Sequence, residues 1–160
     1  MAVADHTHRA EELFYEGYNC CQSVLGAFAD ELQLDEQMLF SLASSFGAGM
    51  GRLREVCGAV SGMFLIAGLA FGYSNPKDIQ AKAEHYRRIQ QLAQEFTEKN
   101  GSIICRQLLG LRAGKSDPTP EARTSQYYRH RPCAALVKDA AQIMDHYMER
   151  MKYHENRSNL

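Results

Sequence analysis

Apolar residues recur at intervals of three and four along most of the chain, a spacing that places them on one face of an α-helix. Side chains that commonly cap helices precede the first three of these segments, at Asp5, Asn19 and Asp35. Gln22 follows Asn19 by three residues, so this pair predicts a capping box. The side chains expected to face inward from the second and third helices are Val24, Leu25, Phe28, Leu32, Met38, Leu39, Leu42 and Ala43.

The middle of the chain contains an uncharged run from Val56 to Tyr73. Its length is at the lower limit for crossing a bilayer. Four glycines dilute its hydrophobicity, and amphipathic segments flank it on both sides. The run therefore predicts a buried central helix that begins near Cys57, and no membrane span. Gly58 and Gly62 are expected to let this helix pack closely against a neighbour.

A long amphipathic helix is predicted after this run. Asn75 is a suitable cap and Pro76 a suitable first residue, so the helix is expected to open there. Gly101 is expected to end it. The predicted apolar stripe consists of Ile79, Ala83, Tyr86, Ile89, Ala93 and Phe96.

The last third of the chain predicts a short helix, a long loop and a final helix. Ser102 is a candidate cap for the short helix. Residues 110–131 lack a sustained apolar period and contain prolines, which is typical of a loop. Pro132 is expected to open the final helix, whose methionines are expected to form core or a dimer seam. These methionines are Met144, Met148 and Met151.

Length and composition agree with one folded domain. A chain of 160 residues is long enough to bury a core without disulfides. No repeat or strand pattern is found, so we expect an all-α, compact single-domain helical bundle over residues 1–160, with its core in about 10–150. It is expected to pack around the central small-residue helix. The net charge of -1 removes the electrostatic argument for binding nucleic acid.

The cysteines are the unusual part of the composition. The first residues show no signal-peptide pattern, so the expected location is cytoplasmic. In that compartment cysteines more often bind metals, catalyse reactions or fill cores than form structural disulfides. Five cysteines cannot all pair within one chain.

Four of the five cysteines fall in or near the first turns of predicted helices. We call them the helix-start cysteines: Cys20, Cys57, Cys105 and Cys133. Free N–H groups and the positive end of the helix dipole favour a thiolate, which is the form that binds metals and attacks disulfides. Arginines adjoin three of these cysteines in the sequence. His130, three residues before Cys133, is a candidate for tuning a thiolate or cluster, or a plain loop histidine.

Residue spacing leaves the role of the cysteines open. No Cys-x-x-Cys is present, so the four could form one sulfur site or be inert core residues. Gly47, Gly49 and Gly51 do not have the spacing of a nucleotide-binding fingerprint. They are expected to form a tight connection with positive φ angles near Cys57. His6, near the N-terminus, is expected to be solvated.

A family resemblance changes this picture. Residues 57–62, Cys-Gly-Ala-Val-Ser-Gly, match the Cys-Gly-Ala-x-x-Gly signature of the C_GCAxxG_C_C family of redox-active proteins. The segment 19–20 resembles the first cysteine motif of that family, and residues 46–51 resemble its glycine-rich stretch. Cys105 and Cys133 fall where its last two cysteines are expected. The resemblance spans most of the chain, and the order of the motifs makes it specific.

The resemblance implies a redox function for the helix-start cysteines, while Cys21 is extra to the family pattern and is placed outside the site. A related domain forms the N-terminal part of split-Soret cytochromes, where similar cysteines are associated with an iron–sulfur cluster. The resemblance thus implies electron transfer through an iron–sulfur cluster such as [2Fe–2S], or another metal, with an unidentified redox partner. The alternatives are a thiol–disulfide oxidoreductase or redox sensor without a cofactor, and a structural zinc or interaction protein.

Overall fold

Side-chain caps begin the first helices where the sequence predicts them. The structure is a computed structural model that describes residues 5–112 and 114–158. Asp5 accepts a hydrogen bond from the Thr7 N–H, and the Asn19–Gln22 capping box is present. Asp35 caps its helix in the same way. The capped helices are α1 (His6–Tyr15), α2 (Cys20–Ala27) and α4 (Glu36–Ala43), whereas the short α3 (Ala29–Leu32) follows α2 and has no side-chain cap.

The remaining elements are also helical, which confirms the all-α prediction. They are η1 (Ser44–Phe46), α5 (Gly47–Met50), α6 (Gly58–Phe71), α7 (Ile79–Asn100), α8 (Cys105–Leu108), α9 (Ser125–His130) and α10 (Cys133–Ser158). Within the described ranges, β pairing is limited to one isolated antiparallel bridge between Val56 and Ile104. The described helices include none long and apolar enough to cross a membrane.

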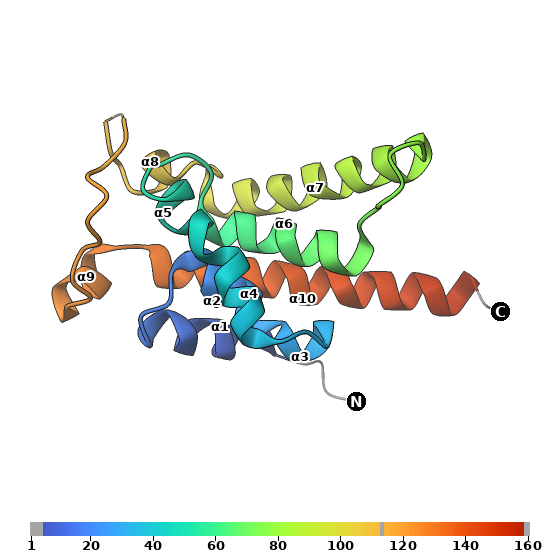
Figure 1. The fold of residues 1–160 in the computed structure, drawn as a ribbon, viewed down its shortest axis with the longest axis horizontal. Coiled ribbons are helices and arrows are strands. Elements are labelled where there is room, and N and C mark those ends of the chain that lie inside the picture. The colour runs from blue at the N-terminus through green and yellow to red at the C-terminus, as the bar shows by residue number, and fades with distance from the viewer. Residues whose placement is uncertain (1–4, 113, 159–160) are drawn as a thin grey trace.

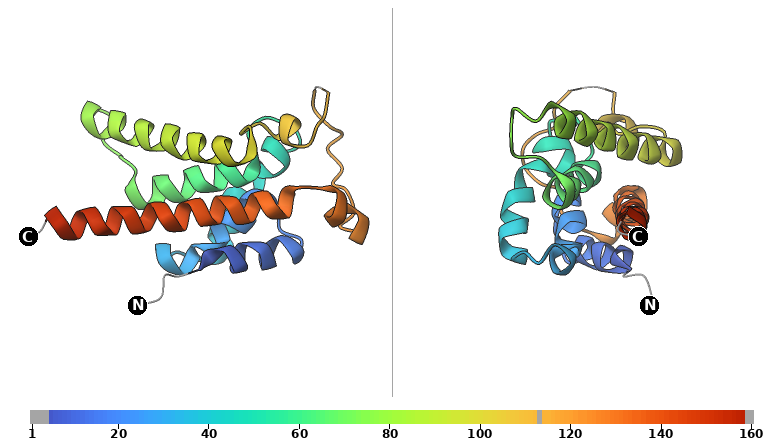
Figure 2. Two further views of the ribbon diagram at one scale, coloured as in Figure 1. Left: turned by 180° about the vertical axis from the view of Figure 1, so that it is seen from behind. Right: turned by 90° about the vertical axis from the view of Figure 1, so that its right-hand side faces the viewer.

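The long helices run roughly side by side, and α10 extends along the whole bundle (Figure 1). In the end-on view of Figure 2, α4 and α10 lie on opposite sides, with α2 and α6 between them. Helix α2 contacts α1, α4, α6 and α10. Buried apolar side chains from Ala10 to Met148 form one cluster around this centre. The bundle is therefore built on the pair α2 and α6, and the elements α5, α8 and α9 gather at one end of it.

Helix α6 is the predicted central helix, and its first half is buried almost completely. A β-carbon added at Gly62 would lie 2.8 Å from the Val24 β-carbon on α2. Glycine at this position therefore sets the distance between the two central helices, as the sequence analysis expects.

The predicted apolar faces of two helices are partly wrong. On α4, Met38 and Leu42 are exposed, whereas Leu39 and Phe40 are buried. Helices α4 and α7 both lie at the surface and bury only a narrow stripe of side chains. Helical periodicity alone therefore does not fix which of their apolar residues face inward.

The same correction applies to α7. This helix begins at Ile79 and is capped by Asp78, three residues later than Asn75–Pro76 suggests. Ile79 and Tyr86 are exposed. The buried side chains of α7 are Arg88, Leu92 and Phe96.

The N-terminal and C-terminal segments meet in the core. His6 donates its backbone N–H to the Asp145 carboxylate at 3.0 Å, and its ring contacts the same carboxylate. The ring also stacks on Phe28 at 4.0 Å. The expectation that His6 is solvated is therefore wrong, because α10 covers the start of α1. Met144 and Met148 are buried in the core, which is one of the two roles predicted for them, the other being a dimer seam.

We expect Gly62→Leu to lower the free energy of unfolding by about 1–3 kcal/mol, because the added side chain meets Val24 in a packed core. Gly68→Leu is the matched control in the same helix, since no atom lies within 4 Å of a β-carbon at Gly68. That change should stabilise by up to about 1 kcal/mol through helix propensity. Urea unfolding measures both. Equal effects of the two substitutions would contradict the close contact of α2 with α6.

Candidate functional site

The helix-start cysteines converge on one cavity of about 60 Å³ at the end of the bundle. Cys20, Cys105 and Cys133 are the first residues of α2, α8 and α10, and Cys57 immediately precedes α6. Three of them are buried, whereas Cys20 is partly exposed. Cys21 is fully buried on α2 and is not among the described residues that line the cavity. The structure thus brings together the four sulfurs that the sequence analysis groups and leaves the fifth apart.

A short backbone pairing holds Cys57 and Cys105 beside each other. The Cys57 N–H donates to the Ile103 carbonyl at 2.7 Å, and the Cys105 N–H donates to the Glu55 carbonyl at 2.6 Å. The isolated β bridge lies between these two hydrogen bonds. Two cysteines separated by 48 positions in the sequence are therefore fixed by main-chain contacts, which sequence periodicity does not reveal.

Glycines allow the surrounding backbones to approach the cavity. A β-carbon on Gly58 would lie 3.0 Å from the Cys20 β-carbon, so the start of α6 can lie against the start of α2. A β-carbon on Gly49 would lie 2.6 Å from the Cys105 β-carbon. Any side chain at these two positions would push Cys20 and Cys105 away from the cavity.

The glycine-rich segment forms a left-handed turn over the site. Five consecutive residues have φ between 56° and 69°: Ala48, Gly49, Met50, Gly51 and Arg52. The left-handed conformation costs an L-residue about 1–2 kcal/mol, and runs of it are rare. Positive φ angles are expected for Gly47, Gly49 and Gly51; the structure has them at Gly49 and Gly51, whereas Gly47 has φ -63°, and it adds three residues with side chains. Residues keep such a strained backbone conformation only where the surrounding structure holds them in it, and these residues are concentrated at functional sites.

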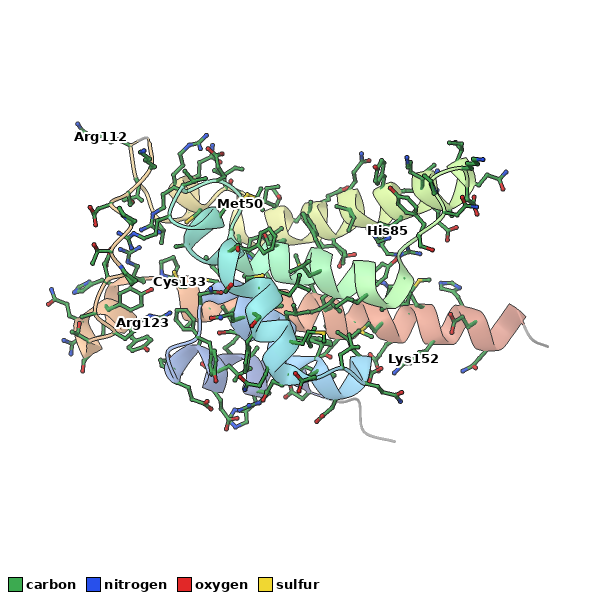
Figure 3. The ribbon with its side chains drawn as sticks, in the orientation of Figure 1. Met50, His85, Arg112, Arg123, Cys133 and Lys152 are labelled. Atoms are coloured by element: carbon green, nitrogen blue, oxygen red, sulfur yellow. The ribbon has the colours of Figure 1, made fainter. Side chains whose placement is uncertain are left out.

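This turn directs a hydrogen-bond donor at one of the sulfurs. The Ala48 N–H donates to the Cys20 sulfur. Figure 3 shows Met50, Arg123 and Cys133 toward the same end of the molecule, with His85 and Lys152 toward the other. The left-handed turn is thus part of the sulfur site.

Cys20 and Cys133 form a hydrogen-bonded sulfur pair. The Cys133 thiol donates to the Cys20 sulfur, and this bond is the main reason that the pKa of Cys20 falls to about 7. The Ala48 N–H and the positive charge of Arg123 lower this pKa further, while burial opposes them. The same hydrogen bond, together with burial, raises the pKa of Cys133 far above its usual range. The pair is therefore poised as one thiolate beside one thiol.

The other cysteines are held as thiols. Burial, followed by the nearby Cys20 sulfur, raises the pKa of Cys57 to about 12. Burial also raises the pKa of Cys105, although Arg54 donates to its sulfur at 3.7 Å and opposes this rise. Burial likewise raises the pKa of Cys21. The sequence analysis expects thiolates at all four helix starts, but the structure stabilises that form at Cys20 alone.

Three arginines and a tyrosine complete the wall of the cavity: Arg54, Arg123, Arg131 and Tyr127. Arg123 donates to the carbonyls of Phe14 at 3.1 Å and Tyr18 at 3.0 Å, which anchors the loop before α9 against α1. The sequence analysis misses Arg123, because no cysteine lies near it along the chain. His130 is exposed on α9 and is not among the described lining residues; Arg131 occupies the predicted place.

A bound metal ion requires several donor side chains grouped around one point. Within residues 5–112 and 114–158, no three His, Cys, Asp or Glu side chains are grouped so that they could hold a metal ion. The donor set of four cysteines suits zinc or an iron–sulfur cluster, but the placement of the side chains does not.

We expect the reaction of Cys20 with iodoacetamide to follow a titration with a midpoint near pH 7, because the thiolate is the reactive form. In Cys133→Ala, which removes the side-chain hydrogen-bond donor at this position, the midpoint should rise toward the usual cysteine value of about 8.5. Mass spectrometry of the labelled peptide in a Cys21→Ser background measures the rate at Cys20 alone. Cys105→Ser is the control and should leave the midpoint near 7; a wild-type midpoint near 8.5 would show that the pair does not form.

Comparison with known proteins agrees with the arrangement of the cysteines. No curated protein and no solved structure matches the chain. A family model with the description "Putative redox-active protein (C_GCAxxG_C_C)" matches residues 18–147, which include all four helix-start cysteines. Since this match covers most of the sequence, the chain belongs to the C_GCAxxG_C_C family of redox-active proteins.

Proposed function

We propose that this protein carries out thiol–disulfide exchange, with Cys20 as the attacking thiolate and Cys133 as the resolving thiol. The observation that carries this proposal is the contact between the Cys20 and Cys133 sulfurs in a shared cavity. The difference in exposure supports the same roles. Cys20 is the one helix-start cysteine that is partly exposed as a residue, although its sulfur lies in the cavity, where burial opposes ionisation.

The exchange proceeds in two displacements. The Cys20 thiolate attacks a disulfide R–S–S–R′, forms a Cys20–S–S–R bond and releases R′–S⁻. Cys133 then gives up its proton and attacks the Cys20 sulfur, which forms the Cys20–Cys133 disulfide and releases R–S⁻. The substrate disulfide gains two electrons, the cysteine pair loses two, and the Cys133 proton passes to a released thiolate. The reverse reaction, with a partner dithiol as reductant, restores the starting state.

Cys57 and Cys105 remain thiols in this cycle. Their raised pKa values keep them protonated at neutral pH, so neither competes with Cys20 as a nucleophile. A resting state with free thiols suits the reducing cytoplasm that the sequence analysis expects.

An iron–sulfur cluster is the second candidate. One observation favours it: all four helix-start cysteines line the same cavity. Cysteine thiolates are the usual ligands of [2Fe–2S] and [4Fe–4S] clusters, and one-electron transfer is the chemistry that a cluster supplies. Zinc would use the same four donors. These alternatives require all four cysteines, whereas disulfide exchange requires two.

The two candidates are distinguished by the cysteines that each requires. We expect the reduced protein, treated with bis(2-hydroxyethyl) disulfide without oxygen, to lose two hydrogen atoms and to yield a peptide pair linked through Cys20 and Cys133. Cys133→Ser should stop at a mixed disulfide on Cys20, because the resolving thiol is absent. Mass spectrometry under non-reducing conditions measures both products.

Cys57→Ser and Cys105→Ser are the matched controls, and both should form the same disulfide as the wild type. Protein purified without oxygen could instead contain stoichiometric iron and absorb visible light. If each of the four single cysteine variants lost that iron, the iron–sulfur cluster would be the better explanation of the site. A protein that forms no linkage between Cys20 and Cys133 would refute the exchange reaction directly.

A further inference from the structure

A second cavity of about 240 Å³ lies beside the cysteine cavity, and we call it the vestibule. The two cavities share six lining residues: Asn19, Ala48, Arg54, Arg123, Tyr127 and Arg131. Cys20 lines the cysteine cavity, and Ala48, which donates to its sulfur, lines both cavities, so the vestibule lies next to the proposed nucleophile. Its volume equals that of about eight water molecules, so it fits a small molecule or one arm of it.

The vestibule is strongly basic although the whole chain is nearly neutral. Four of its lining residues are arginines, namely Arg52, Arg54, Arg123 and Arg131, and one is a carboxylate, Glu121. The formal charge of the lining is therefore +3, against -1 for the entire chain. A concentration of one charge sign in a cleft attracts a ligand of the opposite sign.

Two of these arginines form no ion pair with a carboxylate among the described residues. Arg54 is 3% exposed and donates to the Ser116 hydroxyl at 2.9 Å and to the Cys105 sulfur. Arg123 donates to backbone carbonyls. In the described part of the chain, neither arginine has a carboxylate within 4 Å. A buried charge without a counter-charge is unfavourable, so a bound anion would stabilise Arg54, whereas Arg123 is only partly buried and already lies near the Cys20 thiolate.

The remaining charges are balanced by a single side chain. Glu121 lies 3.9 Å from the Arg52 guanidinium and also contacts Arg131. One carboxylate thus pairs with Arg52, which lines the vestibule alone, and with Arg131, which lines both cavities together with Arg54 and Arg123. Arginine binds carboxylates through two parallel hydrogen bonds, which would orient such a group. Pro118, Pro120 and the Tyr127 ring provide apolar surface for the carbon chain of a ligand.

We propose that the vestibule selects small disulfides that carry carboxylates, and holds the carboxylate so that the adjacent sulfur faces Cys20. The inference rests on the proposed exchange reaction and adds the substrate class to it. Cys20 attacks the near sulfur of the bound disulfide and releases the far arm as an anionic thiolate. Cys133 then displaces the arm that the arginines hold, and the cysteine pair keeps the disulfide bond.

A series of three disulfides of similar length tests the charge preference. They are 3,3′-dithiodipropionate, which is anionic, bis(2-hydroxyethyl) disulfide, which is neutral, and cystamine, which is cationic. We expect the rate constant for oxidation of reduced protein to be at least about tenfold higher for the anionic compound than for the cationic one at low salt. The ratio should fall as salt is added, because charge attraction is screened. Rapid quenching with acid, followed by mass spectrometry, gives the rates.

Two substitutions change the charge of the vestibule in opposite directions. Arg52→Gln should lower the rate with dithiodipropionate, and Glu121→Gln should raise it, because it frees two arginines from their shared carboxylate. The ratio of the rate with dithiodipropionate to the rate with the neutral disulfide should therefore fall in Arg52→Gln and rise in Glu121→Gln. Equal rates for the three disulfides in wild-type protein, or a preference for cystamine, would overturn the vestibule proposal and leave disulfide exchange intact.

Binding without reaction separates the vestibule from the exchange chemistry. Suberate has the length and charges of dithiodipropionate but no sulfur, and 1,6-hexanediamine corresponds in the same way to cystamine. We expect suberate, and not the diamine, to shift the NMR signals of vestibule residues in Cys20→Ser, which cannot react at this position. Shifts caused by suberate would support the vestibule as an anion site even if no disulfide oxidised the protein. Failure of the oxidation would refute only the exchange reaction. Absence of shifts by suberate would overturn the vestibule.

Discussion

The close approach of α2 and α6 is the contact on which the rest of the structure depends. Glycine at positions 58 and 62 removes the side chains that would separate these helices, and the start of each helix carries a site cysteine. Helix α10 then packs against both, which brings Cys133 to Cys20. A wider spacing between the central helices would leave the core loosely packed and would also separate the sulfurs. Stability and function are therefore set by the same small residues.

The site gains its reactivity from asymmetry among similar residues. Four cysteines surround one cavity, yet only Cys20 combines partial exposure, an S–H donor, a backbone N–H and a nearby arginine. Burial dominates at Cys57 and Cys105. The left-handed turn contributes to this difference because it delivers the Ala48 N–H to one sulfur. The conformational strain of Ala48, Met50 and Arg52 is thus used to stabilise one charge.

Much of the helix pattern could be predicted from the sequence, because caps and glycines act locally. Asp5, the Asn19 capping box and the glycine at 101 mark real helix ends. The placement of the cysteines at helix starts is also local, and the family motif identifies the same four. Contacts that join distant segments could not be predicted in this way. The Val56–Ile104 bridge, the partners of Arg123 and the burial of His6 under α10 each depend on packing between segments far apart in the chain.

The position of Cys133 at the start of the last helix has a consequence for biosynthesis. Cys20 is synthesised before Cys133, and the core around α1 and α2 is incomplete until α10 packs against them. Until α10 docks, Cys20 lacks its S–H donor and its thiol keeps an ordinary acidity, so little of it is ionised at neutral pH. In the proposed exchange reaction, the Cys20 thiolate is therefore stabilised only after α10 has packed against α2.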